Sequence, residues 1–142
     1  MVRLGFVTRE LERIQGGELL AAISNAMVRL RKEHAGKGPT EAKTYWAGDD
    51  MLIVLMGGGY TAAEETLYQE GRGDTVRHSR QAFQDVLEGR MREIIGDMTR
   101  REVVAFMSAS HQSPDLALEV FVLAPTESDS PTTARDQTSP EG

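Results

Sequence analysis

Residues 51–67 read MLIVLMGGGYTAAEETL and contain both kinds of secondary structure from which this chain is built. Met51 to Met56 form the longest apolar run, and such a run next to turn residues predicts a strand that is buried on both faces. Three glycines then end the strand. Thr61 and Glu64 follow at the spacing of a capping box, in which both side chains bond free backbone N–H groups at a helix start. The run therefore predicts a buried strand, a glycine turn and a capped helix.

An amphipathic helix and a hairpin are predicted before this run. Four apolar residues and His34 recur at steps of three and four, namely Leu20, Ile23, Met27, Leu30 and His34, which is typical of one helix face. We expect the pair Gly16-Gly17 to precede that helix and Gly36 to cap its end. Residues 40–47 alternate in character and a short turn at 48–50 follows them, so they should pair with the buried strand as a β-hairpin.

Two more helices and a second hairpin are predicted after the run. The capped helix should end near Gly71. A longer helix should span about Val76 to Ile95, with Gly96 at its end. Strands at 102–110 and 116–123 follow, and turn-forming residues join them.

The order of these elements predicts an α+β fold. A helix–hairpin–helices–hairpin chain packs naturally as an antiparallel four-stranded sheet with its helices on one face. The strands at 51–56 and 116–123 carry apolar residues on both faces, so helices on one side would leave the other face uncovered. A second copy of the chain would cover it, and we therefore expect a homodimer.

Composition indicates one folded domain and a tail. The 142 residues fit a single domain, which we place at residues 1–124. Residues 125–142 contain no large apolar residue and hold four acidic residues against one basic residue. Such a segment cannot bury enough surface to offset its ordering entropy, so we expect a disordered acidic tail.

Charge and residue content exclude several classes of function. The net charge of −6 argues against nucleic-acid binding. The absence of cysteine removes disulfides, thiolate nucleophiles and cysteine-ligated metals, and it fits a reducing compartment. No apolar run approaches the ~20 residues of a membrane helix, so we expect no direct insertion into a bilayer. These features predict a cytoplasmic protein.

Three places carry side chains suited to binding a ligand. In the loop 36–39, Lys37 offers a positive charge and Gly38 allows close approach of the backbone to a ligand. Thr61 and Glu64 stand at a helix start, where free N–H groups favour an anion, although helix capping alone also explains both residues. Arg80 lies beside the apolar stripe of the long helix, where a guanidinium needs an anion or an acidic partner such as Glu64.

No motif for catalysis, metal binding or a cofactor is found. The three histidines, His34, His78 and His111, lack the spacing of metal ligands. The chain contains no Gly-x-Ser-x-Gly elbow, no Ser-x-x-Lys signature and no dinucleotide fingerprint. We therefore expect no catalytic residue, no metal and no cofactor.

The motifs in their order resemble the MpsC-like domain family. They are the loop 36–39, the strand 51–56 with Gly57 after it, Thr61-x-x-Glu64-x-x-Leu67, Arg80 and the closing strand 118–123. The resemblance spans Gly17 to Leu123. The family is named for a component of a bacterial sodium-translocating, membrane-potential-generating system linked to inorganic-carbon uptake. For this chain the resemblance implies a peripheral or regulatory partner of such a system.

Three functions are compatible with these features. The first is a non-enzymatic cytosolic accessory or sensor domain that binds a small anion, such as bicarbonate or a phosphate-bearing metabolite, near Lys37 and Arg80. It requires Lys37, the helix start at Thr61 and Arg80 to converge. The second is a pure protein-interaction subunit that docks on a membrane complex. The third is an enzyme that uses Glu64 as acid or base and Arg80 as electrostatic stabiliser.

Deletion of residues 125–142 should leave the melting temperature unchanged, because this segment offers no apolar anchor to the folded domain. Thermal unfolding of the full chain and of the truncated chain, followed by circular dichroism, measures this directly. A drop of several degrees on truncation would show that the segment packs against the domain.

Overall fold

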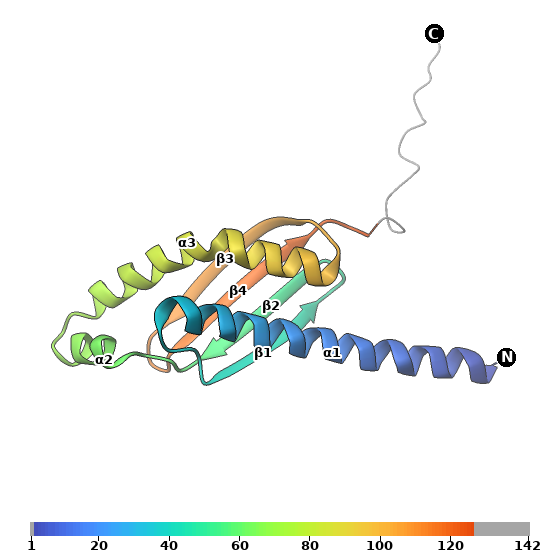
Figure 1. The fold of residues 1–142 in the computed structure, drawn as a ribbon, viewed down its shortest axis with the longest axis horizontal. Coiled ribbons are helices and arrows are strands. Elements are labelled where there is room, and N and C mark those ends of the chain that lie inside the picture. The colour runs from blue at the N-terminus through green and yellow to red at the C-terminus, as the bar shows by residue number, and fades with distance from the viewer. Residues whose placement is uncertain (1, 127–142) are drawn as a thin grey trace, which may run out of the picture.

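The computed structural model describes residues 2–126, with side chains described from residue 16 onward. Its elements run in the order α1 (Val2–Ala35), β1 (Glu41–Ala47), β2 (Met51–Gly57), α2 (Ala62–Gln69), α3 (Gly73–Thr99), β3 (Val103–His111) and β4 (Leu116–Leu123). The fold is α+β, as predicted, with two hairpins that each follow a long helix (Figure 1). Most of the predicted tail, residues 127–142, lies outside the described residues.

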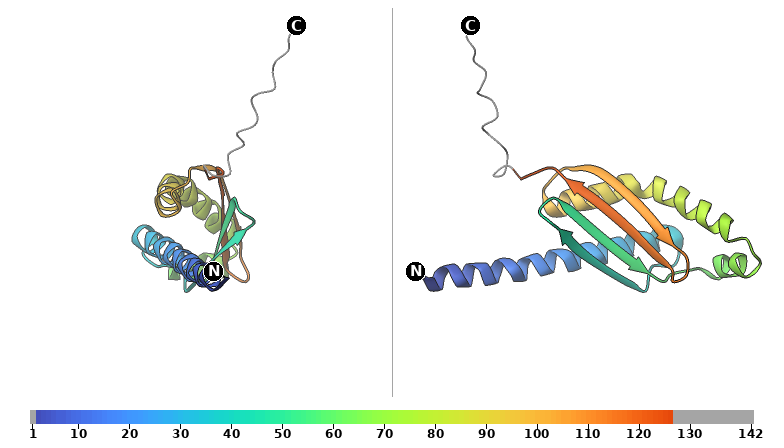
Figure 2. Two further views of the ribbon diagram at one scale, coloured as in Figure 1. Left: turned by 90° about the vertical axis from the view of Figure 1, so that its right-hand side faces the viewer. Right: turned by 180° about the vertical axis from the view of Figure 1, so that it is seen from behind.

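The four strands form one antiparallel sheet in the order β1-β2-β4-β3. The two buried strands, β2 and β4, therefore lie at its centre, and each hairpin contributes one edge strand. Helices α1 and α3 lie side by side on one face of this sheet, and the other face carries none of the described helices (Figure 2). The predicted layer arrangement is confirmed.

The core lies between the sheet and these two helices. Period-two alternation along β2 and β4 points every second side chain to the helices, and the helical stripes of α1 and α3 meet them there. The fully buried members of this cluster include Ile23, Met27, Leu52, Val54, Met91, Ile95 and Phe121.

Two helix boundaries differ from the prediction. The pair Gly16-Gly17 does not precede α1 but lies inside it, and Gly96 lies inside α3 rather than at its end. Glycine lowers helix propensity by ~1 kcal/mol but keeps its backbone N–H, so the hydrogen-bond ladder can continue through it. The end of α3 is instead at Arg100, which adopts a left-handed conformation (φ 60°) and donates its N–H to the carbonyl of Gly96 at 2.8 Å.

The capping box at the start of α2 is confirmed. The Thr61 hydroxyl accepts from the backbone N–H of Glu64 at 3.1 Å, and the Glu64 carboxylate accepts from the backbone N–H of Thr61 at 3.0 Å. These two bonds satisfy two of the free donors at the helix N-terminus and fix the direction in which the helix leaves the sheet.

Candidate functional site

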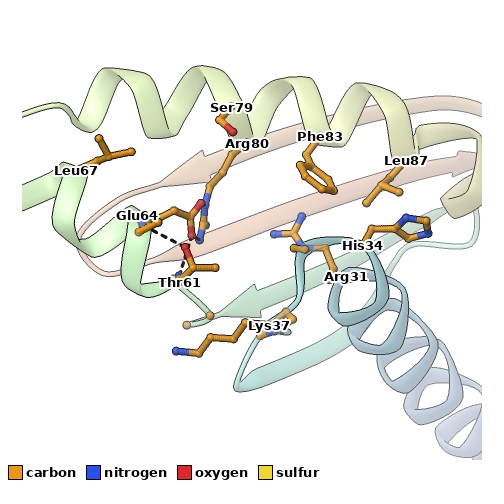
Figure 3. A pocket seen from close by; sticks show the side chains of 15 residues that line it. Arg31, His34, Lys37, Thr61, Glu64, Leu67, Ser79, Arg80, Phe83 and Leu87 are labelled. Carbon is orange, nitrogen blue, oxygen red and sulfur yellow. Dashed lines mark hydrogen bonds and ion pairs between the residues drawn. The ribbon is translucent and has the colours of Figure 1, made fainter.

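A cavity of about 350 Å³ lies at one end of the sheet, between the C-terminal end of α1, the start of α2 and one face of α3 (Figure 3). The segments that line it are far apart in the sequence and meet only through the fold. The residues around it are Arg31, His34, Ala35, Lys37, Pro39, Gly58, Gly59, Thr61, Ala63, Glu64, Leu67, Ser79, Arg80, Phe83 and Leu87.

Four of the five residues singled out in the sequence line this cavity. They are Lys37, Thr61, Glu64 and Arg80, so the loop after α1, the start of α2 and the middle of α3 do converge. Gly38 is not among the lining residues. It packs closely against α1 instead, because a Cβ at Gly38 would stand only 3.2 Å from the Val28 carbonyl oxygen and from Cβ of Lys32.

The glycine turn after β2 holds the mouth of the cavity in place. Gly58 and Gly59 have φ angles of 76° and 97°, a region that favours glycine. A side chain at Gly58 would also collide with Thr40. The Gly58 N–H donates to the Asp115 carbonyl at 3.0 Å, which ties this turn to the turn between β3 and β4.

Arg80 is held by two carboxylates. Its Nε and Nη2 donate to the two oxygens of Glu64 at 2.9 and 3.0 Å, and its Nη1 donates to Asp115 at 2.9 Å. The Arg80 and Glu64 side chains are only 18% and 21% exposed. The acidic partner expected for Arg80 is therefore present, and the sequence did not reveal the second one, Asp115, because it lies 35 residues away in a turn.

The pKa values of the three groups follow from this geometry. Burial lowers the pKa of Arg80, but hydrogen bonds and charges from Glu64 and Asp115 outweigh that effect and raise it. Burial favours the neutral form of Glu64, yet the hydrogen bonds from Arg80 and Thr61 hold its pKa below the usual range. Burial raises the pKa of Asp115, because it outweighs the charge of Arg80 and the hydrogen bond that Arg80 donates.

Tyr60 lies beside Arg80, although it is not among the residues that line the cavity. Its ring lies 4.2 Å from the Arg80 guanidinium, and its hydroxyl donates to the Gln112 carbonyl at 3.0 Å. The exposed Lys37 donates through Nζ to the Tyr60 carbonyl at 2.9 Å. Lys37 is therefore oriented by one bond and keeps two further N–H groups for a ligand.

Arg31 is the residue that the sequence reasoning missed. It is half-buried and lines the cavity from α1. Its side chain makes one hydrogen bond among the described residues, a long one of 3.5 Å from Nη1 to the Gln84 amide oxygen. Among the described residues no carboxylate lies within 4.0 Å of its guanidinium. Burial lowers the pKa of Arg31, and the charge of Glu119 only partly offsets this.

A sequence signal for Arg31 does exist. It stands four residues after Met27, so it falls on the helix face that carries the buried residues of α1. A charged side chain on such a face needs a partner or a ligand.

Behind Arg31 the sheet carries a buried carboxyl group, Glu119 on β4. Its side chain is 0% exposed, and neither oxygen has a partner of hydrogen-bond geometry among the described residues. Burial raises the pKa of Glu119 to about 7, although nearby Gln84, Arg31 and Ser108 favour its charged form. The alternation of β4 predicts that the side chain at this position points toward the helices. It does not explain why an acidic residue stands there.

The arrangement favours an anion. The cavity is lined by three cationic side chains, Arg31, Lys37 and Arg80, and by one carboxylate, Glu64. Arg80 and Glu64 form an ion pair and neutralise each other. The charge left over is that of Arg31 and Lys37. In the described part of the chain no group of three or more His, Cys, Asp or Glu residues is placed to hold a metal ion.

These observations define the class of protein: an α+β domain with helices on one face of an antiparallel sheet and a basic cavity at one end of it. The model of the MpsC family, described as the Na+-translocating membrane potential-generating system (MpsC), matches residues 15–125. The chain belongs to this family, as the ordered motifs indicated.

The other comparisons add no relative, since neither a curated protein nor a solved structure gives a match. Within residues 2–126, none of the helices combines the length and the apolar character needed to cross a bilayer.

Replacement of Arg80 by methionine should lower the free energy of unfolding by about 3 kcal/mol at pH 7, because it leaves two largely buried carboxylates without their cation. The folded-state pKa of Glu64 is depressed, so its stabilisation is present above its unfolded value and is lost as the pH falls through the folded value. The difference between Arg80→Met and the original chain should therefore shrink below about pH 4. Urea unfolding at pH 7 and pH 3.5 measures both effects.

Arg90→Met is the matched control for this experiment. Arg90 and Glu93 are 60% and 73% exposed and 3.9 Å apart on the same helix, so their pairing contributes at most about 0.5 kcal/mol. Equal losses for Arg80→Met and Arg90→Met would show that the bridge contributes no more than a surface pair.

Proposed function

We propose that this protein is a non-enzymatic accessory or sensor protein of a membrane-potential-generating system, that it acts in the cytoplasm, and that it binds a small anion in the cavity between α1, α2 and α3. Membership of the MpsC family supports the association with such a system. The cavity and its charge support the ligand class. A protein of this kind would report on, or respond to, an anion that the membrane system depends on.

The proposal depends mainly on the surroundings of Arg31. A guanidinium that is half-buried, that faces a cavity and that has no carboxylate within 4.0 Å among the described residues is electrostatically incomplete. An anion in the cavity would supply the missing charge and use the planar donor fork of the side chain. Lys37 lines the same cavity and supplies a second cation.

The same geometry argues against catalysis by Glu64 and Arg80. A general acid or base works best with a pKa near the operating pH. Hydrogen bonds from Arg80 and Thr61 outweigh burial and hold the pKa of Glu64 below its usual range. Arg80, for its part, already donates to both carboxylates and has a structural role.

Anions should raise the melting temperature of the protein, because a ligand that binds only the native state stabilises it by RT ln(1 + [L]/Kd). We expect a rise of several degrees with sodium bicarbonate, phosphate or acetate in a thermal-shift experiment, measured against sodium chloride of equal ionic strength. Arg31→Gln should abolish this rise, since glutamine keeps a polar side chain but carries no charge.

Arg29→Gln is the matched control, because Arg29 lies on the same helix, is exposed and does not line the cavity. It should leave the anion-dependent rise intact. An equal rise in the original chain and in Arg31→Gln would place the anion elsewhere and contradict the proposal.

The outer face of the sheet favours a second candidate function, that of a protein-interaction subunit. The register aligns apolar side chains on this face in rows across the strands, for example Tyr45, Ile53, Val120 and Met107. Tyr45 and Met107 at the sheet edges are 44% and 52% exposed, and none of the described helices covers the row. Apolar surfaces of this kind mark interaction sites.

A second copy of the chain is the occupant that we propose for this face. Four strands of about seven residues, ~4.8 Å apart, give a flat area on the order of 400 Å² per copy, or about 800 Å² in the pair, which is the size of a weak interface. The face is low in charge, which suits packing against its own copy. A membrane complex is the alternative occupant.

Light scattering at micromolar concentration should give a mass near twice 15.6 kDa. Met107→Glu should reduce it to the monomer value, because a charge on this apolar row opposes its burial. Val86→Glu on α3 is the control, since Val86 is 77% exposed on the helical side of the molecule. A mass of 15.6 kDa for the original chain would contradict the homodimer and leave the face to the membrane complex.

A further inference from the structure

The cavity has two chemically different walls. Leu67, Phe83 and Leu87 from α2 and α3 form an apolar side, and Arg31 and Lys37 from the end of α1 and the loop after it form a cationic side. Figure 3 shows Phe83 and Leu87 pointing from α3 toward the Arg31 side chain. An occupant that satisfies both walls needs a negative group and an apolar body.

The size of the cavity also favours an occupant with an apolar body. At about 350 Å³ it falls within the range of ~300–1,000 Å³ found for small organic ligands, at its lower end. An inorganic anion of four or five heavy atoms would occupy a small part of this volume and would leave the apolar wall in contact with water.

Phe83 gives an independent reason for an apolar body. Its side chain is 38% exposed although it sits on the helix face that packs toward the core, between Arg80 and Leu87. Leu87, one turn further along, is 3% exposed, so the apolar wall begins in the core and ends at an uncovered aromatic ring. A ligand that lies along this wall would remove the ring from water.

We propose that the natural occupant is an organic carboxylate with a compact apolar body, held with its carboxylate on Arg31 and Lys37 and its apolar part against Phe83, Leu87 and Leu67. This inference rests on the anion site proposed above and names the class of ligand. The carboxylate accepts the forked N–H groups of Arg31, which have no carboxylate partner among the described residues. Lys37 keeps N–H groups free to reach the second oxygen.

Four compounds separate the contributions of charge and apolar body. Hexanoate has both, acetate and bicarbonate have the charge alone, and 1-hexanol has the apolar body alone. Isothermal titration of the full chain at constant ionic strength should give the tightest binding for hexanoate. Along the series acetate, butanoate, hexanoate, Kd should fall by about threefold to fourfold for each methylene that enters the cavity.

Variants of each wall test the orientation. Arg31→Gln should weaken hexanoate binding at least tenfold and leave hexanol binding unchanged. Phe83→Ala should weaken hexanoate binding severalfold and leave acetate binding unchanged. Arg29→Gln and Val86→Ala are the controls on the same two helices, because both residues are exposed and lie outside the cavity. Their binding constants should equal those of the original chain.

The outcomes distinguish this inference from the function on which it rests. Equal affinity for bicarbonate, acetate and hexanoate, lost in Arg31→Gln, would leave the anion site standing and overturn the organic ligand. Equal affinity for hexanol and hexanoate, kept in Arg31→Gln, would overturn the anion site itself, and so would the absence of binding by all of the anions. The titrations on the original chain decide these points even if one of the variants fails to fold.

Discussion

The shared ion pair of Arg80 with Glu64 and Asp115 is the interaction on which the cavity end of the structure depends. It joins three segments through one guanidinium: α3, the first turn of α2 and the turn between β3 and β4. Tyr60 stacks on the same guanidinium and extends the connection to the glycine turn after β2. A largely buried cation needs its carboxylates, so these segments hold one another in position.

Because the charge of Arg80 is neutralised by its two carboxylates, the positive charge in the cavity is that of Arg31 and Lys37. Arg31 reaches the cavity from α1 and contacts Gln84 on α3, and Gln84 in turn donates to Ser108 on β3 at 2.6 Å. This short polar chain runs above the buried Glu119 at the centre of the sheet. Buried polar groups are costly unless they are paired, and their concentration at one end of an otherwise apolar core is typical of functional sites.

The cavity and the uncovered apolar face lie on opposite sides of the sheet. The cavity lies on the helical side, whereas the rows of apolar residues occupy the uncovered side. A ligand in the cavity and a partner on the uncovered face would therefore not compete for the same residues. Glu119 and Val120 are neighbours in β4 and point to opposite faces of the sheet.

Sequence alone determined the elements whose signals are local. The run 51–56, the capping box of Thr61 and Glu64 and the order of helices and hairpins were sufficient for the α+β fold and the family, because periodicity and caps depend on neighbouring residues. The start of α1 and the end of α3 could not be placed, since glycine keeps its backbone N–H and a helix can continue through it. Only the tertiary structure decided that Asp115 shares Arg80 and that Arg31 lacks a carboxylate among the described residues. Both depend on side chains brought together across many residues, and the free energy of a charge is set by what surrounds it in space.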